Sequence, residues 1–227
     1  MILTSDTPIN RLGIFFFYDA QGVVDDYVLK LLDGFMPHFS ALTIVCNGKL
    51  NDAGREKLLR YTSKLIVREN KGFDVWAYKT ALDSYGWQKL EQFDEIVLFN
   101  ATIMGPVYPF SEMFEAMNKR DLDFWGITKF HRVEHDPFGR SPYPYLPEHI
   151  QSHFHAYRKV CTRARRSGIT GITFLPSMTI TILWACMNPC LPSVLPIRVS
   201  SGMYMSIRPT WKGSRTAPLP MRRNDWS

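Results

Sequence analysis

The first 160 residues alternate short apolar runs with segments of helical spacing, and this rhythm limits the folds open to the chain. Strands are predicted at residues 12–18, 41–46, 65–67, 95–99 and 124–127, with a further strand at 150–157. Helices are predicted between them, at residues 24–35, 51–61, 75–85 and 111–117. Parallel strands need such crossover helices, and each helix must bury its apolar side on the sheet. The pattern therefore predicts an α/β fold with a mostly parallel sheet and helices on both faces.

Length and composition bound the class of protein. The chain has 227 residues, of which 45% are hydrophobic, and this is typical of a globular domain with a sizeable core. No apolar run approaches the roughly 20 residues of a transmembrane helix. Residues 1–11 lack the apolar region of a secretory signal, so a cytoplasmic protein is expected. The four cysteines show no C-x-x-C spacing, which favours reduced thiols.

The net charge of +6 comes from one part of the chain. Residues 1–160 contain 18 Lys and Arg against 20 Asp and Glu, whereas residues 161–227 contain nine Lys and Arg and one acid. The second part also carries recurrent prolines and loses the strand–helix rhythm. We therefore predict an α/β domain at 1–160 and an irregular, basic, Pro-rich tail at 161–227. Such a tail could bind nucleic acid or an anionic membrane, but without interleaved aromatics or a defined motif nucleic acid is not the expected partner.

The segment that follows the third strand has the layout of a ligand-binding loop. An apolar run at 64–68 is followed by Glu-Asn-Lys-Gly-Phe-Asp and then by a helix. Ligands of α/β folds bind outside the carboxyl ends of strands, where helix N-termini present free N–H groups to anions. Lys71 is a candidate for binding phosphate, Gly72 for positive φ or close ligand approach, and Asp74 for contacting ribose or base. The alternatives are a solvated loop lysine, a structural turn and a helix N-cap.

Three further residues are candidates for a nucleotide site. Asp19 follows the first strand and contacts a base or ribose, or else it forms a turn with Gly22. Lys79 contacts phosphate, or else it is a surface lysine of its helix. Asn100 ends the fourth strand and binds the donor, or else it makes a strand-end turn. No metal ligand is predicted among the five histidines at 131, 135, 149, 153 and 155, because they lack cysteine partners and zinc-site spacing.

A series of sequence blocks occurs in an order and spacing that resemble one protein family. The blocks lie at residues 16–19, 22–28, 47–50, 55–58, 68–74, 77–79, 105–109, 123–128 and 150–152. Over roughly residues 11–159 the chain resembles the rhamnan-synthesis F family of bacterial polysaccharide enzymes. This resemblance implies a nucleotide-sugar-binding fold of the GT-A type and a glycosyltransferase that acts on rhamnose-rich cell-surface polysaccharides.

The same resemblance implies substrates and partners. The donor would be a nucleoside-diphosphate sugar, in the first place dTDP-rhamnose, and the acceptor a lipid-linked glycan. The protein would act beside other polysaccharide-assembly enzymes, in the cytoplasm or peripherally on the inner membrane. Lys71, Asp74 and Asn100 would line the donor site. Transfer requires that the charge of the departing diphosphate is neutralised and that the acceptor hydroxyl meets a base.

One position departs from the family pattern. After the fourth strand the family more usually carries Asn-Asp-Ser/Thr, whose acid can hold Mg²⁺ or Mn²⁺, but this chain has Ala101 between Asn100 and Thr102. A methyl group binds no cation. Metal assistance is therefore absent, or Asp74 or Asp123 supplies it, or the protein is a catalytically inactive binding domain.

The tail departs from the family as a whole. Some codons that are compatible with residues 168–173 and 177–190 encode a different sequence when they are read in a shifted frame. The sequences that they can encode include strings such as Asp-Tyr-Trp-Asp-His. These strings are similar to what the family carries after the Arg-Lys segment at 158–159. A frameshift near residues 159–161 would explain this, and the alternative is a genuine disordered basic tail. The nucleotide sequence of the locus distinguishes the two hypotheses.

Overall fold

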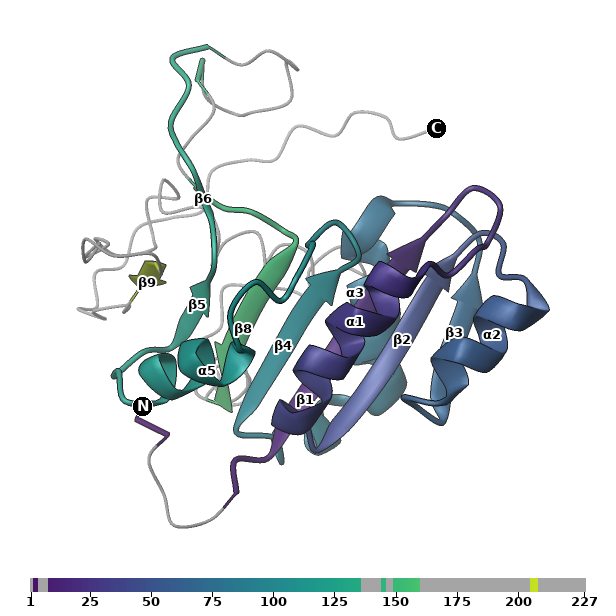
Figure 1. The fold of residues 1–227 in the computed structure, drawn as a ribbon. Coiled ribbons are helices and arrows are strands. Elements are labelled where there is room, and N and C mark those ends of the chain that lie inside the picture. The colour runs from purple at the N-terminus through teal and green to yellow at the C-terminus, as the bar shows by residue number, and fades with distance from the viewer. Residues whose placement is uncertain (1, 4–7, 136–143, 146–148, 160–204, 208–227) are drawn as a thin grey trace.

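The computed structural model describes residues 2–3, 8–135, 144–145, 149–159 and 205–207. Within these residues the main sheet has the strand order β3-β2-β1-β4-β8-β5-β9 (Figure 1). Its strands are β1 (Arg11–Tyr18), β2 (Ala41–Asn47), β3 (Lys64–Arg68), β4 (Glu95–Asn100), β5 (Phe124–Gly126), β8 (Phe154–Arg158) and β9 (Met205–Ile207). Strands β1 to β4 are parallel, and β8 runs antiparallel between β4 and β5. The predicted mostly parallel sheet is confirmed.

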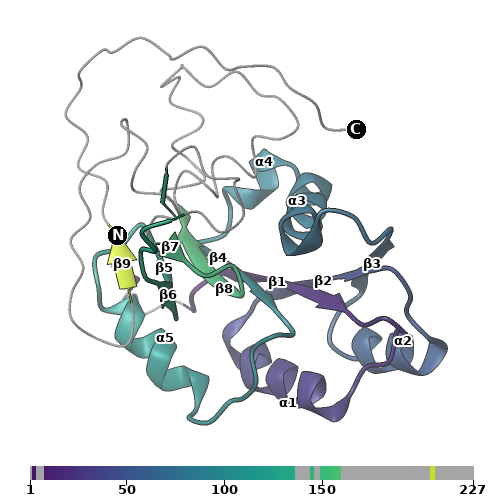
Figure 2. The same ribbon diagram turned by 90° about the horizontal axis from the view of Figure 1, so that it is seen from above.

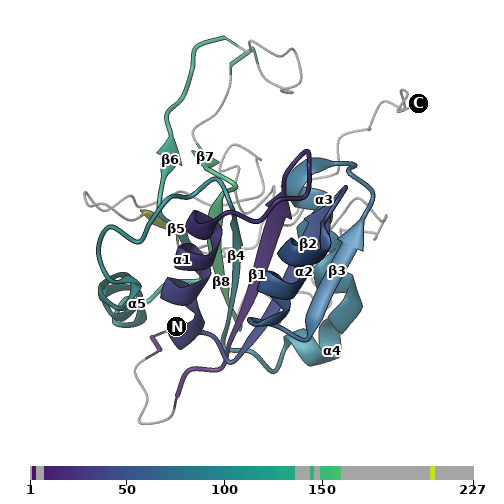
Figure 3. The same cartoon turned by 45° about the vertical axis from the view of Figure 1, so that its right-hand side comes forward.

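The helices cover both faces of this sheet. One face carries α1 (Asp26–Phe35), α2 (Asp52–Leu59) and α5 (Phe110–Asn118), and the other carries α3 (Phe73–Tyr85) and the short α4 (Trp87–Leu90), as Figure 2 shows. A 3-10 turn, η1 (Met36–His38), follows α1. Two short strands, β6 (Lys129–Phe130) and β7 (His149–Ile150), pair with each other and stand beyond the carboxyl ends of the parallel strands (Figure 3). The predicted α/β fold class is therefore confirmed.

Alternating strand residues divide the core into two apolar layers. Phe15 and Phe99 pack on the α1 and α5 side, where Phe35 of α1 lies 4.5 Å from Phe99, centroid to centroid. Ile14 and Leu98 pack on the α3 side. Because successive side chains of a strand point to opposite faces, the residues of each strand alternate between the two layers. This alternation determines which side chains meet at the carboxyl ends of the strands.

Several predicted elements differ in detail from the observed ones. The segment 150–157 was predicted as one strand, but β7 and β8 are separated there by a turn at 152–153. The helix predicted from residue 111 begins at Phe110 with Pro109 as its N-cap. Strand β3 is only half-buried, because it forms the edge of the sheet and pairs on one side. Apolarity predicts a strand correctly but does not place it in the sheet.

The predicted tail lies almost wholly outside the described residues. Only β9 is described within residues 161–227, and it pairs antiparallel with β5. The prediction of an irregular tail over residues 161–227 therefore stays a prediction. The domain boundary near residue 160, the disorder hypothesis and the frameshift hypothesis stay predictions.

The predicted N-cap of α2 gives a direct test of local stability. Asn51 Oδ1 accepts a hydrogen bond from the backbone N–H of Gly54 at 2.6 Å. We expect Asn51→Ala to lower the free energy of unfolding by about 1 kcal/mol, because the orphan N–H loses its partner. Urea denaturation followed by circular dichroism measures this, and Asn51→Ser, which keeps a capping oxygen, should lose much less. Equal losses in both variants would show that the cap itself is not the cause.

Candidate functional site

Polar side chains gather where the central strands end on the face covered by α3. Tyr18, Asn47 and Arg68 end β1, β2 and β3 and lie side by side in register. Phe16 packs against Tyr78 of α3, so Tyr18, two residues further on, points to the same face. Asn47 donates to the carbonyl of Phe73 at 3.1 Å, which ties the end of β2 to the start of α3. Tyr18, Asn47 and Arg68 thus form a polar row at the carboxyl ends of three parallel strands.

The end of β4 extends this row toward β8. Leu98 of β4 packs on the α3 side, and Asn100 therefore projects to that side as well. The backbone N–H of Asn100 donates to the carbonyl of His153, the residue before β8, at 3.1 Å. By the same alternation Ala101 turns to the opposite face, where it packs against the α1 and α5 layer. The position at which an acid was expected does not face the row.

A strained backbone starts α3 above this row. Gly72 is the N-cap in a left-handed conformation with φ of 73°, and Phe73 follows with φ of 54°. A Cβ at Gly72 would lie 2.0 Å from the ring of Trp76, so both the backbone and the packing require glycine. Backbone strain of this kind is common at binding sites. The predicted positive φ at Gly72 is confirmed.

Asp74 and Asn100 meet beneath the start of α3. The amide of Asn100 donates to Asp74 Oδ2 at 3.4 Å, and Asp74 Oδ1 accepts from the backbone N–H of Val75 at 2.8 Å. Asn100 Oδ1 also accepts from the hydroxyl and the backbone N–H of Thr102. The strand-end turn predicted as the alternative for Asn100 is therefore present. Gly72 holds the N-cap position, so N-capping by Asp74, its own predicted alternative, is not observed.

Arg68 provides a positive charge beside these groups. One guanidinium nitrogen, Nη1, donates to Asn47 Oδ1 at 2.7 Å and to the carbonyl of Lys71 at 3.0 Å. This bridge holds the loop 69–72 over the end of β3. The side chain of Lys71 is exposed on that loop. Arg68 and Lys71 are thus two cations near the N-terminus of α3.

The two remaining predicted residues have structural partners. Asp19 Oδ1 accepts from the backbone N–H groups of Val23 and Gln21, at 2.9 Å each, and these bonds hold the pKa of its carboxyl below the usual value. With Gly22 this is the turn predicted as the alternative. Lys79 forms an ion pair with Asp83, four residues further along α3. Contacts of Asp19 or Lys79 with a nucleotide stay predictions.

Exposed aromatic rings flank the polar row. Phe73 is 80% exposed, Tyr18 is 48% exposed and Trp76 is 41% exposed, although burial is the usual state of such rings. The Tyr18 ring lies beside Gly48, where an added Cβ would lie 3.7 Å from it. Flat apolar faces next to hydrogen-bonding groups suit the stacking of a base or of a sugar.

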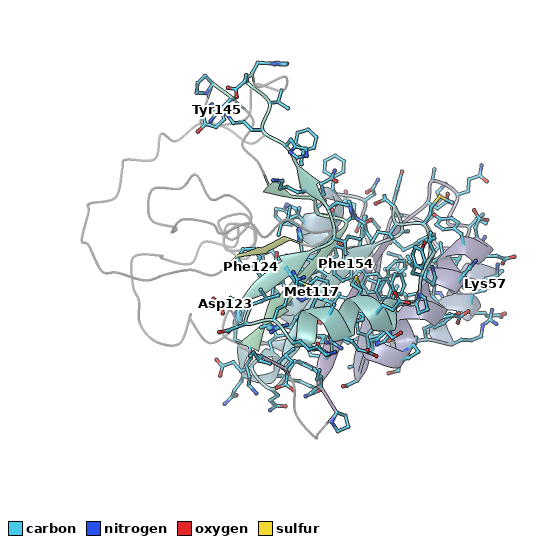
Figure 4. The ribbon with its side chains drawn as sticks, turned by 60° about the vertical axis from the view of Figure 1, so that its left-hand side comes forward. Lys57, Met117, Asp123, Phe124, Tyr145 and Phe154 are labelled. Atoms are coloured by element: carbon cyan, nitrogen blue, oxygen red, sulfur yellow. The ribbon has the colours of Figure 1, made fainter. Side chains whose placement is uncertain are left out.

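The described residues do not make a divalent-metal site. No group of three His, Cys, Asp or Glu side chains lies close enough together within them to hold a metal ion. Ala101 faces the apolar layer, and among the described residues Asp74 is the one carboxylate hydrogen bonded to Asn100. Asp123, predicted as a substitute, lies before β5 at the opposite end of the sheet, where Arg158 donates to its carbonyl (Figure 4). The prediction that Asp123 could supply a metal ligand next to Asn100 is therefore wrong.

Sequence reasoning missed several residues of the row. Asn47, Arg68 and Tyr18 each end an apolar strand, and that shared position is the signal that could have identified them. His153 was weighed only as a zinc ligand. Its carbonyl contact with Asn100 depends on β8 pairing with β4, which no local pattern predicts.

The sequence model of one family, rhamnan synthesis protein F, matches residues 42–166. The chain belongs to the rhamnan synthesis protein F family. This match includes Asn47, Arg68, Asp74, Asn100 and His153, whereas Tyr18 and Asp19 precede its first residue. It confirms the resemblance drawn from the sequence blocks. No curated protein sequence matches the chain significantly.

Several solved structures have a similar fold. The similar structures include 4-diphosphocytidyl-2C-methyl-D-erythritol synthase, at 12% identity, 81% coverage of this chain, 88% of that chain and a TM-score of 0.45. They also include glucosyl-3-phosphoglycerate synthase from Mycobacterium tuberculosis with UDP, at 9% identity, coverages of 82% and 83% and a TM-score of 0.43. At these TM-scores the structural overlap is partial, and it assigns no role to any residue of this member of the rhamnan synthesis protein F family.

No described helix of this family member has both the length and the apolarity needed to cross a bilayer.

Cys46 is a free thiol within β2, and burial raises the pKa of that thiol to about 12. A thiol of this kind is an unreactive core side chain. The other three cysteines lie outside the described residues.

Proposed function

We propose that the protein transfers a sugar from a nucleoside diphosphate to a glycan acceptor during rhamnan synthesis, with dTDP-rhamnose as donor and a lipid-linked glycan as acceptor. Membership of the rhamnan synthesis protein F family carries this proposal. The polar row at the carboxyl edge of the sheet supports it, because α/β folds bind ligands at that edge. Other polysaccharide-assembly enzymes would be its partners, in the cytoplasm or peripherally on the inner membrane.

The donor would lie across the start of α3. The diphosphate would face Arg68, Lys71 and the first N–H groups of α3, since cations and a helix N-terminus both stabilise anions. Asp74 would accept hydrogen bonds from the ribose, and Asn100 would hold Asp74 in place. Asp19 would contact the base at the end of β1. Lys79, already paired with Asp83, stands one turn further along α3 and would act on phosphate only through its charge.

No step of this proposal uses a metal ion. The charge of the departing diphosphate would be neutralised by Arg68 and Lys71, because the position of the expected acid, Ala101, offers no ligand. Dialysis against a chelator should therefore leave donor binding unchanged. Loss of donor binding after chelation, restored by Mg²⁺ or Mn²⁺, would contradict the cation assignment.

The first test is donor binding and transfer by the full 227-residue chain. We expect dTDP-rhamnose to bind in calorimetry and radiolabelled rhamnose to appear in a lipid-linked glycan. Binding without transfer would select the alternative, a catalytically inactive binding domain, which the apolar setting of Ala101 favours. Absence of both would remove the proposal.

The role of Asp74 can be measured on its own. We expect Asp74→Asn to raise the dissociation constant for dTDP-rhamnose at least tenfold, because hydrogen bonds to a charged group contribute about 1.5–3 kcal/mol. Asp52→Asn makes the same change in the first turn of α2, on the other face of the sheet, and should leave binding unchanged. Equal binding by the Asp74 variant and the native chain would show that Asp74 only supports the backbone.

A further inference from the structure

His153 is fixed beside the donor site by its own backbone. Its carbonyl accepts the backbone N–H of Asn100, and the carbonyl of the preceding residue, Ser152, accepts the hydroxyl of Tyr78 at 3.4 Å. Phe99 pairs with Phe154 in the antiparallel ladder, so His153 stands next to Asn100 in register. Paired residues of antiparallel strands point to the same face. The imidazole therefore lies on the α3 face, where Asn100 meets Asp74.

Within the described part of the chain, one ring nitrogen of His153 has a hydrogen-bond partner and the other has none. Nε2 and Thr128 Oγ1 are hydrogen bonded at 2.7 Å, and the residues that the structure describes give Nδ1 no hydrogen bond. Thr128 is held in turn by its carbonyl, which accepts the backbone N–H of Gln151 at 3.2 Å. The ring is thus half-buried, oriented through Nε2 and open at Nδ1.

The charges around the ring suit a group that takes up a proton. Burial lowers the pKa of the His153 imidazole, and the nearby Asp74 carboxylate raises it in part. Tyr78 of α3, whose hydroxyl donates to the Ser152 carbonyl, is fully buried; burial raises its pKa well above the usual value, so it remains a neutral phenol. Near neutral pH the ring is therefore a neutral base, and Asp74 stabilises the cation that forms when it is protonated.

We infer that His153 is the base that deprotonates the acceptor hydroxyl. This inference rests on the proposed transferase function and adds a residue to it. The acceptor O–H proton moves to Nδ1 of His153, and the acceptor oxygen forms a bond to the anomeric carbon of the donor. The bond from that carbon to the diphosphate oxygen breaks, and the nucleoside diphosphate leaves with the electron pair. The imidazolium then releases its proton to solvent.

Thr128 is a positioning residue in this scheme. By accepting a hydrogen bond from Nε2–H, its hydroxyl holds the ring in the tautomer whose lone pair is on Nδ1. The carboxylate of Asp74 acts through its charge, without a hydrogen bond to the ring. The two roles predict different consequences when each side chain is replaced.

Kinetics test the inference first. We expect His153→Gln, whose amide can keep the bond to Thr128, to lower kcat about 10²–10⁴-fold while the dissociation constant for dTDP-rhamnose stays within threefold. The native kcat should fall as the pH drops through a pKa below about 6.5, and this acidic limb should vanish in the variant. His131→Gln, a change at an exposed histidine, is the control. A kcat within threefold of native, or an unchanged limb, would overturn the inference while the transferase function stands.

A ligand-free measurement tests the orientation of the ring. In ¹⁵N-labelled protein at pH 8 we expect the neutral ring of His153 to carry its proton on Nε2, and Thr128→Val to shift the ring toward a mixture of tautomers. A proton on Nδ1 in the native protein would overturn the inference whatever the kinetics show. If the native chain binds donor but transfers nothing, the transferase function fails and the base assignment fails with it.

Discussion

Replacing Glu95 by Gln should destabilise the fold by about 3–5 kcal/mol, because the change leaves two buried arginines without a counter-charge. Glu95 is fully buried at the start of β4. Its Oε2 accepts from Arg11 Nε at 2.7 Å, and its Oε1 accepts from Arg158 Nε at 3.2 Å and from Trp125 Nε1 at 2.9 Å. One carboxylate thus joins β1, β4, β5 and β8 at the end of the sheet opposite the site.

The two arginines also donate hydrogen bonds to groups outside the strands. Arg158 donates to the carbonyls of Met117, in the last turn of α5, and of Arg120, just after that helix. Arg11 donates to Asn118 Oδ1 and to the carbonyl of His38. The Arg11 guanidinium also lies 4.3 Å from the centre of the Phe114 ring. Loss of the central charge therefore loosens α5 as well as the strands.

Urea unfolding followed by circular dichroism measures this effect as a shift in the midpoint at constant slope. Glu56→Gln, on the exposed side of α2, makes the same chemical change and should stay within about 0.5 kcal/mol of the native protein. Trp125→Phe removes one neutral donor from Glu95 and should lie between the two. A Glu95 variant no less stable than the Glu56 control would show that the charges are not coupled.

Local sequence patterns predicted much of the fold because they record local burial. Apolar runs placed β1 to β4, and Asn51 marked the start of α2. The family resemblance implied that Asp74 and Asn100 share one site, and the structure shows the two side chains hydrogen bonded. These features depend on neighbours within a few residues, or on the general rule that parallel strands end together.

Contacts across the sheet were not predictable in the same way. Glu95 is 84 residues from Arg11 and 63 from Arg158, and in the sequence all three look like ordinary surface charges. His153 meets Asn100 only because β8 inserts between β4 and β5 in reverse direction. Strand order decides such meetings, and the order depends on the packing of the whole sheet rather than on any single segment.

Replacing Gly72 by Ala should cost about 2 kcal/mol or more and weaken donor binding at least tenfold. Two effects add. The left-handed φ of 73° costs a residue with a Cβ about 1–2 kcal/mol, and the new methyl group would lie 2.0 Å from the Trp76 ring. Relief requires the ring or the first turn of α3 to move, which also moves Phe73 and Asp74. Stability and binding should therefore fall together.

Two further variants separate these effects. Gly48→Ala carries the backbone cost alone, because φ is 76° there and an added Cβ would meet its nearest neighbours at 3.5 Å or more. The double variant Gly72→Ala/Trp76→Ala no longer has the clashing ring. Its loss in free energy of unfolding should therefore be smaller than the sum of the losses of the two single variants by at least about 1 kcal/mol. The donor affinity of the double variant should recover toward that of Trp76→Ala. Strict additivity would mean that the ring already moves freely and that Gly72 serves only its backbone conformation.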